Sequence, residues 1–267
     1  MTGIEISIDP IIFRIGALSV SWHGFFMVVG IVTAVWMSAR LSARDGLSSD
    51  RLYNIALFAV PGGIIGARLI HVIDYWDFYA ANPASIIQVW NGGLALYGGI
   101  LGGALTGLVY AWIKKFDISP YADRIAPGMI LAQAIGRIGD VINGEHFSKA
   151  LDSPLAVYYS NPNSPAFGMP PSHLAVGYEL IMDLLIFALL WKLLGRLKPD
   201  GTLFLLYLAI YSTGRFFLSF LRLDSHTVAL GLNQPQWIAF IVIAGVLVIF
   251  FWRRRKHAVA DVSESDD

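Results

Sequence analysis

Two arginines with polar neighbours lie within apolar segments of this chain. Arg137, Asp140 and Asn143 are spaced three residues apart, so on a helix they would share one face. A guanidinium presents a planar fork of donors that suits a phosphate group. The alternative is an Arg137–Asp140 ion pair that only tightens a helix end. The spacing alone leaves both interpretations open.

Arg215 has no acidic residue one turn away on its own predicted helix. A charged side chain is expensive in the bilayer, so its partner must come from another helix or from a ligand. The alternative without a functional role is that the Arg215 side chain extends so that its guanidinium reaches the membrane surface.

A glycine-rich segment and a lone histidine give weaker signals. Gly99, Gly103 and Gly107 are spaced four apart, a pattern that allows membrane helices to pack closely, and packing is the better interpretation of these glycines. Tyr97 carries a hydroxyl among small residues and could equally be an interfacial anchor. His23 stands at the start of the first apolar segment, where a histidine is more often structural than catalytic.

The elements that position these residues follow from composition. Of 267 residues, 56% are hydrophobic and only 14% are charged, whereas soluble domains have about 25% charged residues. A membrane-crossing helix needs roughly 20 mostly apolar residues, and lipid offers no partner for backbone polar groups, so each span should be helical. The predicted spans are 19–39, 52–73, 93–113, 122–142, 174–194, 202–221 and 234–252.

Basic residues orient the spans. Cytoplasmic segments of membrane proteins carry an excess of Lys and Arg. With the N-terminus outside, thirteen of the nineteen basic residues fall in inner segments: Arg40, Arg44, Arg51, Lys114, Lys115, Arg124, Lys192, Arg196, Lys198, Arg253, Arg254, Arg255 and Lys256. We therefore predict an all-α integral membrane protein of about seven transmembrane helices, with its N-terminus outside and its C-terminus in the cytoplasm.

Two regions are predicted. Residues 1–256 form one transmembrane domain, which includes a small ordered extracytoplasmic cap at 144–173 with five prolines. The alternative for this segment is a flexible loop without a role. Residues 257–267 form an acidic, disordered cytoplasmic tail. Glu5 and Asp9 precede the first apolar run, so nothing there reads as a cleaved signal peptide.

Composition also excludes several classes. A net charge of zero argues against nucleic acid as a partner. Without any cysteine, a disulfide framework, a thiolate metal site and a cysteine nucleophile are impossible. No cluster of metal ligands is visible, and no metal or cofactor is expected.

The polar groups all map to the outer side of the predicted spans. One polar cavity with two or three arginines would suit an anionic ligand, and the obvious one is a phospholipid headgroup.

Residues 136–145, Gly-Arg-Ile-Gly-Asp-Val-Ile-Asn-Gly-Glu, resemble the signature G-R-x-G-N-x-x-N-x-E of bacterial prolipoprotein diacylglyceryl transferases. Four further segments are similar to family motifs in order and spacing over nearly the whole chain. They are Trp22-His23-Gly24, residues 92–99, residues 211–216, and Pro171-Ser172 followed by Tyr178-Glu179. Four positions depart from the family pattern: His23 for Tyr, Asp140 for Asn, Ser148 for Gly and Ser219 for Glu. Tyr97 stands where many members have the His proposed as base, in a segment that ends in His-Gly-Gly or Tyr-Gly-Gly.

The resemblance implies a multi-pass enzyme of the bacterial inner membrane. Its reaction moves the diacylglyceryl group of phosphatidylglycerol to the lipobox cysteine of a preprolipoprotein, recognised with its signal peptide, and releases glycerol phosphate. Arg137 and Arg215 would hold the lipid phosphate. The other residues implied at the substrate site are Asp140, Asn143, Glu145, Tyr211, Gly98 and Gly99.

The resemblance leaves the base open between Tyr97 and His23. We hypothesise that their roles are exchanged in this chain, with His23 as base and Tyr97 as hydrogen-bond donor, because the pKa of histidine lies near working pH. In the alternative, His23 is an anchor and Tyr97 alone is functional. The residues leave two other functions open. One is a non-catalytic relative that binds phospholipid or signal peptides, and the other is a small anion transporter, which Asp123 and Asp183 alone do not support.

Overall fold

Helices dominate the computed structural model, which describes residues 3–16, 18–225 and 227–265. The α-helices are α1 (Trp22–Arg44), α2 (Ser49–Asp74), α3 (Trp76–Ala81), α4 (Leu96–Ile113), α5 (Ser119–Asn143), α6 (Ala175–Leu193), α7 (Thr202–Leu218) and α8 (Gln234–Ser265), and the 3-10 helices are η1 (Pro83–Ile87), η2 (Val89–Asn91) and η3 (Ser219–Leu221). The sequence did not predict the short strands, which are β1 (Ile4–Ile6), β2 (Ile11–Ile15), β3 (Leu18–Ser21), β4 (Val157–Tyr159), β5 (Thr227–Ala229) and β6 (Leu232–Asn233).

Every predicted span coincides with a helix. Six helices of the described chain, namely α1, α2, α4, α5, α7 extended by η3, and α8, are long and apolar enough to cross a membrane. Helix α6 matches the predicted span 174–194 but is not among these six helices. It carries Glu179, Asp183 and Lys192. A multi-pass membrane protein that is mainly α-helical is therefore supported.

The chain separates into two compact units, one of Met1–Ala34 with Ala126–Asp267 and the other of Val35–Ile125. The single domain predicted over 1–256 remains a prediction.

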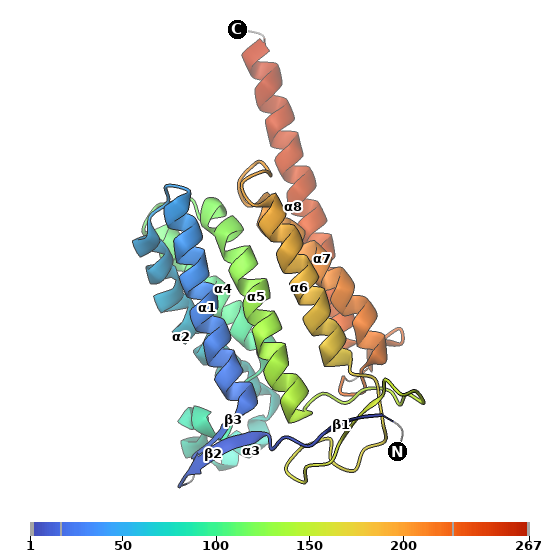
Figure 1. Cartoon of the computed structure of the whole chain (residues 1–267). Coiled ribbons are helices and arrows are strands. Elements are labelled where there is room, and N and C mark those ends of the chain that lie inside the picture. The colour runs from blue at the N-terminus through green and yellow to red at the C-terminus, as the bar shows by residue number, and fades with distance from the viewer. Residues whose placement is uncertain (1–2, 17, 226, 266–267) are drawn as a thin grey trace. The chain divides into compact units, whose positions relative to one another are not determined.

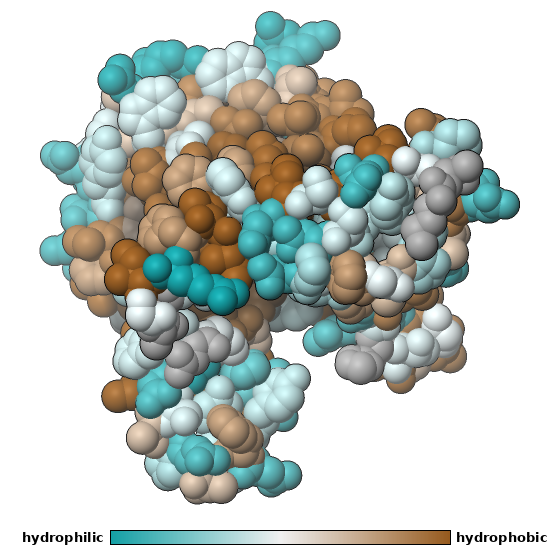
Figure 2. Space-filling model, turned by 60° about the horizontal axis from the view of Figure 1, so that its bottom comes forward, coloured by the Kyte–Doolittle hydropathy of each residue, from teal (hydrophilic) through white to brown (hydrophobic). Residues whose placement is uncertain are grey.

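In the first unit, α7 packs against both α6 and α8 (Figure 1). Its core consists of buried residues from α5, α6 and α7: Ala126, Ile130, Ile186, Leu190, Leu203 and Tyr207. The large apolar side chains that remain exposed on these helices include Ile181, Leu185, Phe240 and Val248, as expected for surfaces that face lipid. In Figure 2, hydrophobic side chains on the face shown lie beside a band of hydrophilic ones.

The residues at 144–173 are held by backbone pairs to other parts of the first unit. Ser148 pairs with Arg222, and β4 pairs in parallel with β1 near the N-terminus. Ser164 Oγ donates to the carbonyl of Asn143 over 2.9 Å. These bonds fix the segment directly after α5, so they also fix the surroundings of the residues at the end of that helix.

The second unit is built on close contact between α2 and α4. A Cβ added at Gly98 would lie 2.4 Å from the carbonyl oxygen of Gly66, and one added at Gly102 would lie 2.3 Å from that of Gly62. Only glycine permits this approach. The glycine-rich segment therefore packs closely, but its tightest contacts are at Gly98 and Gly102 and not at the spaced glycines. Of the latter, an added Cβ at Gly103 would lie 3.1 Å from the carbonyl oxygen of Ala59, whereas Gly99 and Gly107 have ordinary contact distances.

The last helix continues beyond its apolar part through the basic run at 253–256 and ends at Ser265. The sequence instead predicted disorder over 257–267. Arg, Lys, Ala and Glu are good helix formers, so the residues after the span can extend its helix. Asp266 and Asp267 lie outside the described residues.

Candidate functional site

The C-terminal turns of α5 and the first turn of α1 create the centre of the site. The two helices approach each other at Gly139, where an added Cβ would lie 2.7 Å from the Cα of His23. His23 Nδ1 then lies 2.6 Å from Asp140 Oδ1. Arg137 Nη1 donates to the other oxygen of Asp140 over 2.9 Å. The predicted Arg137–Asp140 pair is thus confirmed, but it is one part of a larger cluster.

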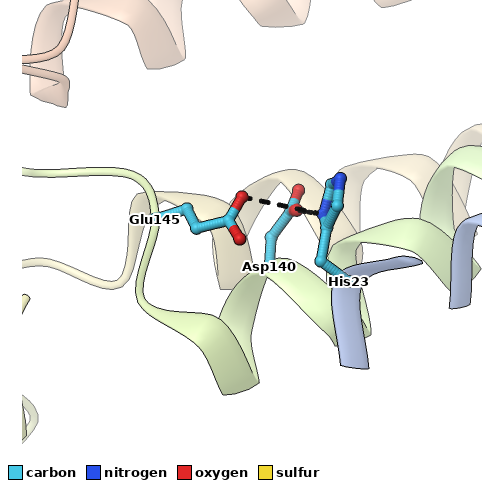
Figure 3. Close-up of side chains that lie close together, drawn as sticks. All are labelled: His23, Asp140 and Glu145. Carbon is cyan, nitrogen blue, oxygen red and sulfur yellow. Dashed lines mark hydrogen bonds and ion pairs between the residues drawn. The ribbon is translucent and has the colours of Figure 1, made fainter. Parts of the chain in front are cut away.

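Glu145, which Figure 3 shows beside Asp140 and His23, and Asn143 complete this part of the site. Glu145 Oε2 lies 3.9 Å from His23 Nδ1, and Asn143 Nδ2 donates to Glu145 Oε1 over 2.6 Å. Asp140 is buried, whereas the side chain of Glu145 is 36% exposed. The site therefore has a buried carboxylate beneath the histidine and a second carboxylate at its edge.

A third carboxylate, Glu179 on α6, contacts three guanidinium groups. Its Oε2 lies 2.7 Å from Arg137 Nη2, its Oε1 lies 3.1 Å from Arg222 Nη1, and Oε1 also contacts Arg215. The Glu179 side chain is only 1% exposed. The partner expected for Arg215 from another helix is Glu179. Sequence analysis did not name Glu179 as a site residue, although a glutamate within an apolar span was a usable signal.

Beyond the helices, His146 and Asp224 extend the cluster. His146 Nδ1 lies 2.9 Å from Asp224 Oδ2, and His146 Nε2 lies 3.6 Å from Asp140 Oδ2. Arg222 also pairs with Asp224. Burial lowers the pKa of His146, but its hydrogen bonds to Asp140 and Asp224 outweigh this effect, so its pKa is raised above the ordinary value. Sequence analysis missed both residues, and His146 adjoins the signature without belonging to it.

Hydrogen bonds within the cluster also outweigh the effect of burial on the pKa of Asp224. Burial raises the pKa of Asp224, but hydrogen bonds from His146 and Arg222 hold it well below its ordinary range. The carboxylate is therefore charged at neutral pH. Three guanidinium groups and four carboxylates, those of Asp140, Glu145, Glu179 and Asp224, thus lie together with two imidazoles.

The arginines differ in exposure. The side chains of Arg137 and Arg215 are each 15% exposed, whereas that of Arg222 is 4% exposed. A guanidinium has five N–H donors, and Arg137 directs one nitrogen to each of two carboxylates. Arg137 and Arg215 can therefore present a donor edge to an anion, while Arg222 serves to balance the buried carboxylates.

Nδ1 of His23 and carboxylate oxygens of Asp140 and Glu145 lie within 4.8 Å of one another, a grouping that could hold a metal ion. However, Arg137 already occupies the other oxygen of Asp140. Its guanidinium would repel a divalent cation on the same carboxylate. The set is better suited to positioning an imidazole next to an anion site.

The other residues that the sequence predicts at the site belong to α4 and α7. Tyr97, Gly98 and Gly99 open α4 in the second unit, where Gly98 packs on α2. Tyr211 lies on α7 in the first unit, with its ring centroid 6.1 Å from that of Tyr207. The predicted roles of these four residues in substrate binding remain predictions.

Apolar helices of membrane-spanning length and a largely buried cluster of arginines, carboxylates and histidines define a multi-helix membrane protein with a charged site. The chain belongs to the prolipoprotein diacylglyceryl transferase family, whose model matches residues 10–252. The resemblance drawn from the sequence motifs is thereby confirmed.

Three relatives show how far this similarity extends, and each is called phosphatidylglycerol–prolipoprotein diacylglyceryl transferase. The protein of Dehalococcoides mccartyi is 37% identical over 261 residues, which cover 96% of this chain and 98% of that protein. The protein of Bacillus licheniformis is 34% identical, with 93% and 94% covered. The protein of Staphylococcus aureus is 34% identical, with 94% and 91% covered.

Proposed function

We propose that this chain transfers the diacylglyceryl group of phosphatidylglycerol to the lipobox cysteine thiol of a preprolipoprotein. A carbon–sulfur bond forms, the bond between the glyceryl carbon and its phosphate oxygen breaks, and glycerol phosphate leaves with the electron pair. The thiol proton passes to a base. The similarity to enzymes of this name over nearly the full length of the chain carries the proposal.

Arg137 and Arg215 are suited to hold the phosphate of the lipid. Their guanidinium groups are fixed on one buried carboxylate, Glu179, so they need little reorganisation when charge develops on the departing phosphate. Preorganised donors of this kind are often the largest contribution to catalysis. In this proposal Glu179 sets the separation of the two arginines, and Asn143 and Glu145 orient the headgroup.

His23 is suited to act as the base. With Asp140 accepting a hydrogen bond from Nδ1–H, the imidazole keeps Nε2 unprotonated and able to take the thiol proton. The resulting thiolate is the attacking nucleophile. The side chain of His23 is 35% exposed, so a substrate can reach it. We assign Tyr97 the role of a hydrogen-bond donor to the headgroup, as the exchange hypothesis requires.

The proposed topology has seven transmembrane helices, with the N-terminus outside, the C-terminus in the cytoplasm and residues 144–173 as an extracytoplasmic cap in the bacterial inner membrane. It includes α6 as a span. The buried Glu179 of α6 is compensated by arginines, so this charge does not prevent the helix from lying in the membrane.

Complementation tests the function directly. The chain, expressed in a bacterium depleted of its own transferase, should restore growth and add a diacylglyceryl group to a reporter lipoprotein, detected by mass spectrometry. Arg137→Ala, at matched expression, should fail. A reporter that stays unmodified despite normal amounts of the wild-type chain in the membrane would refute the proposal.

A further inference from the structure

A cavity of about 130 Å³ lies beside the ion-pair cluster. The segment after α5 and the beginning of α6 form most of its wall, and all of its lining residues belong to the first unit. Apolar parts of the wall come from residues such as Val157, Val176 and Leu223, while Asp140, His146 and Ser148 contribute polar groups.

Ser148 gives the wall a hydroxyl that the fold does not use. The residue is 7% exposed, and its Oγ is buried without a hydrogen-bond partner among the described residues. Its backbone pairs with Arg222, which fixes its position. Leaving a buried hydroxyl unsatisfied is costly, so Ser148 is placed as though a ligand group were to complete it.

The cavity adjoins the proposed phosphate site through two shared residues. Asp140 lines the cavity and binds Arg137 over 2.9 Å. His146 also lines it, and its Nδ1 lies 2.7 Å from Arg222 Nη2. A phosphate held by Arg137 and Arg215 would therefore lie next to the wall of this cavity. The group on the second ester oxygen of that phosphate can therefore enter the cavity.

We propose that this cavity binds the terminal glycerol of the phosphatidylglycerol headgroup, with Ser148 and His146 forming hydrogen bonds to its two free hydroxyls. The inference rests on the proposed function and adds a source of donor specificity to it. An apolar cavity of about 150 Å³ accommodates benzene, and glycerol has as many non-hydrogen atoms as benzene. The carbon chain of glycerol would contact the apolar wall.

The test compares two lipid donors with identical acyl chains, using the purified full-length chain in mixed micelles and a cysteine-containing acceptor peptide. Phosphatidylglycerol carries the diol. Phosphatidylmethanol has the same phosphodiester charge but a methyl group in place of the glycerol. The wild-type chain should show a higher kcat/KM with phosphatidylglycerol. Ser148→Ala should reduce kcat/KM for phosphatidylglycerol about tenfold, as expected for losing one or two hydrogen bonds, and should leave phosphatidylmethanol nearly unchanged.

Three further variants make the result specific. Ser148→Thr retains the hydroxyl and should retain the preference, whereas Ser148→Val fills the space and should abolish it. Ser160→Ala is the matched control, because Ser160 lies in the same segment but does not line the cavity. Equal losses on both donors in Ser148→Ala, or no loss on either, would overturn the glycerol site. A wild-type chain that uses both donors equally would overturn it as well. Failure of the wild-type chain with both donors would instead refute the proposed function together with this inference.

Discussion

His23 and Asp140 come from α1 and α5, and their Nδ1 and Oδ1 atoms lie 2.6 Å apart. Both residues depart from the family pattern, which has tyrosine and asparagine at these positions. Because the two replaced residues contact each other, they can be understood as one coupled replacement. The pattern residues would form a neutral hydrogen bond, whereas this chain has an imidazole oriented by a carboxylate.

The first prediction is that the replacements at positions 23 and 140 are coupled in their effect on activity. His23→Tyr and Asp140→Asn should each lower kcat/KM strongly, because the first removes the proposed base and the second removes the carboxylate that orients it. The double variant should recover activity relative to the two single losses combined. Coupling between contacting residues is typically about 0.5–3 kcal/mol. A double-mutant cycle of kcat/KM with phosphatidylglycerol measures this coupling. Strictly additive losses would show that the two replacements act independently and would contradict the prediction.

The same site offers a test of the base. His23→Phe cannot accept the thiol proton and should be severely impaired. If the roles of His23 and Tyr97 are exchanged in this chain, the double variant His23→Tyr with Tyr97→His should be more active than His23→Phe. Full activity in His23→Phe would end this assignment, and the base would have to be sought at Tyr97 or in a bound water.

The second prediction is that Arg137 is needed as a guanidinium and not only as a positive charge. Arg137→Lys keeps the charge but cannot contact Asp140 and Glu179 while presenting a fork to phosphate. We expect a loss of about 2–4 kcal/mol of transition-state stabilisation, or roughly 30- to 1000-fold in rate. Arg44→Lys is the control, because Arg44 is 54% exposed and forms a surface pair with Asp45. Near-full activity in Arg137→Lys and Arg137→Ala would make Arg137 purely structural.

The third prediction concerns topology. The natural chain has no cysteine, so single cysteines report their location without background. In intact cells, Phe167→Cys should react with an impermeant thiol reagent, whereas Arg255→Cys should be protected until the membrane is permeabilised. The reverse pattern would place residues 144–173 in the cytoplasm and remove the proposed site from the outer surface.

Local sequence features were enough to predict the helices but not the ion-pair network. Hydropathy is a property of consecutive residues, so each predicted span matches a helix. Glu179 and Arg222 come from segments distant from Arg137 in sequence, and no spacing rule connects them. The absence of an acid near Arg215 did indicate that a partner was missing, but it could not identify Glu179.

Arg68 in the second unit illustrates the same limit. Its guanidinium donates to the carbonyls of Ser85, Ile86, Gly92 and Gly93. Every residue has a carbonyl, so such acceptors leave no mark in the sequence. Arg68 therefore fixes the loop before α4 in a way that could be found only from coordinates.

The fourth prediction follows from the raised pKa of His146. Burial and the nearby Arg222 oppose protonation of His146 in the folded chain, but the hydrogen bonds to Asp140 and Asp224 outweigh them and raise its pKa. Its stabilising contribution is fully present below the unfolded pKa of about 6.5 and is lost as pH rises through the higher folded value. The Tm in detergent should therefore decline with rising pH across this range. His146→Gln should remove this decline, and an unchanged profile in that variant would contradict the assignment.

The fifth prediction contrasts two buried acids on α6. Glu179 and Asp183 are one turn apart, so they lie on the same side of the helix, and both are almost completely buried. Glu179 contacts three guanidinium groups. Neither oxygen of Asp183 has a hydrogen-bond partner among the described residues. The two positions therefore share burial and differ in compensation.

Amide substitution separates these two situations because it keeps the shape and removes the charge. Glu179→Gln leaves three arginines without their shared counter-charge, and breaking a buried pair in this way costs about 3–5 kcal/mol. We expect a large fall in Tm and loss of transfer. Asp183→Asn removes a carboxylate that gains little in return for its burial, so Tm should be unchanged or higher. Thermal unfolding in one detergent compares both variants with the wild-type chain. Equal destabilisation would show that Asp183 is also compensated, and a tolerated Glu179→Gln would show that Glu179 does not hold the arginines in place.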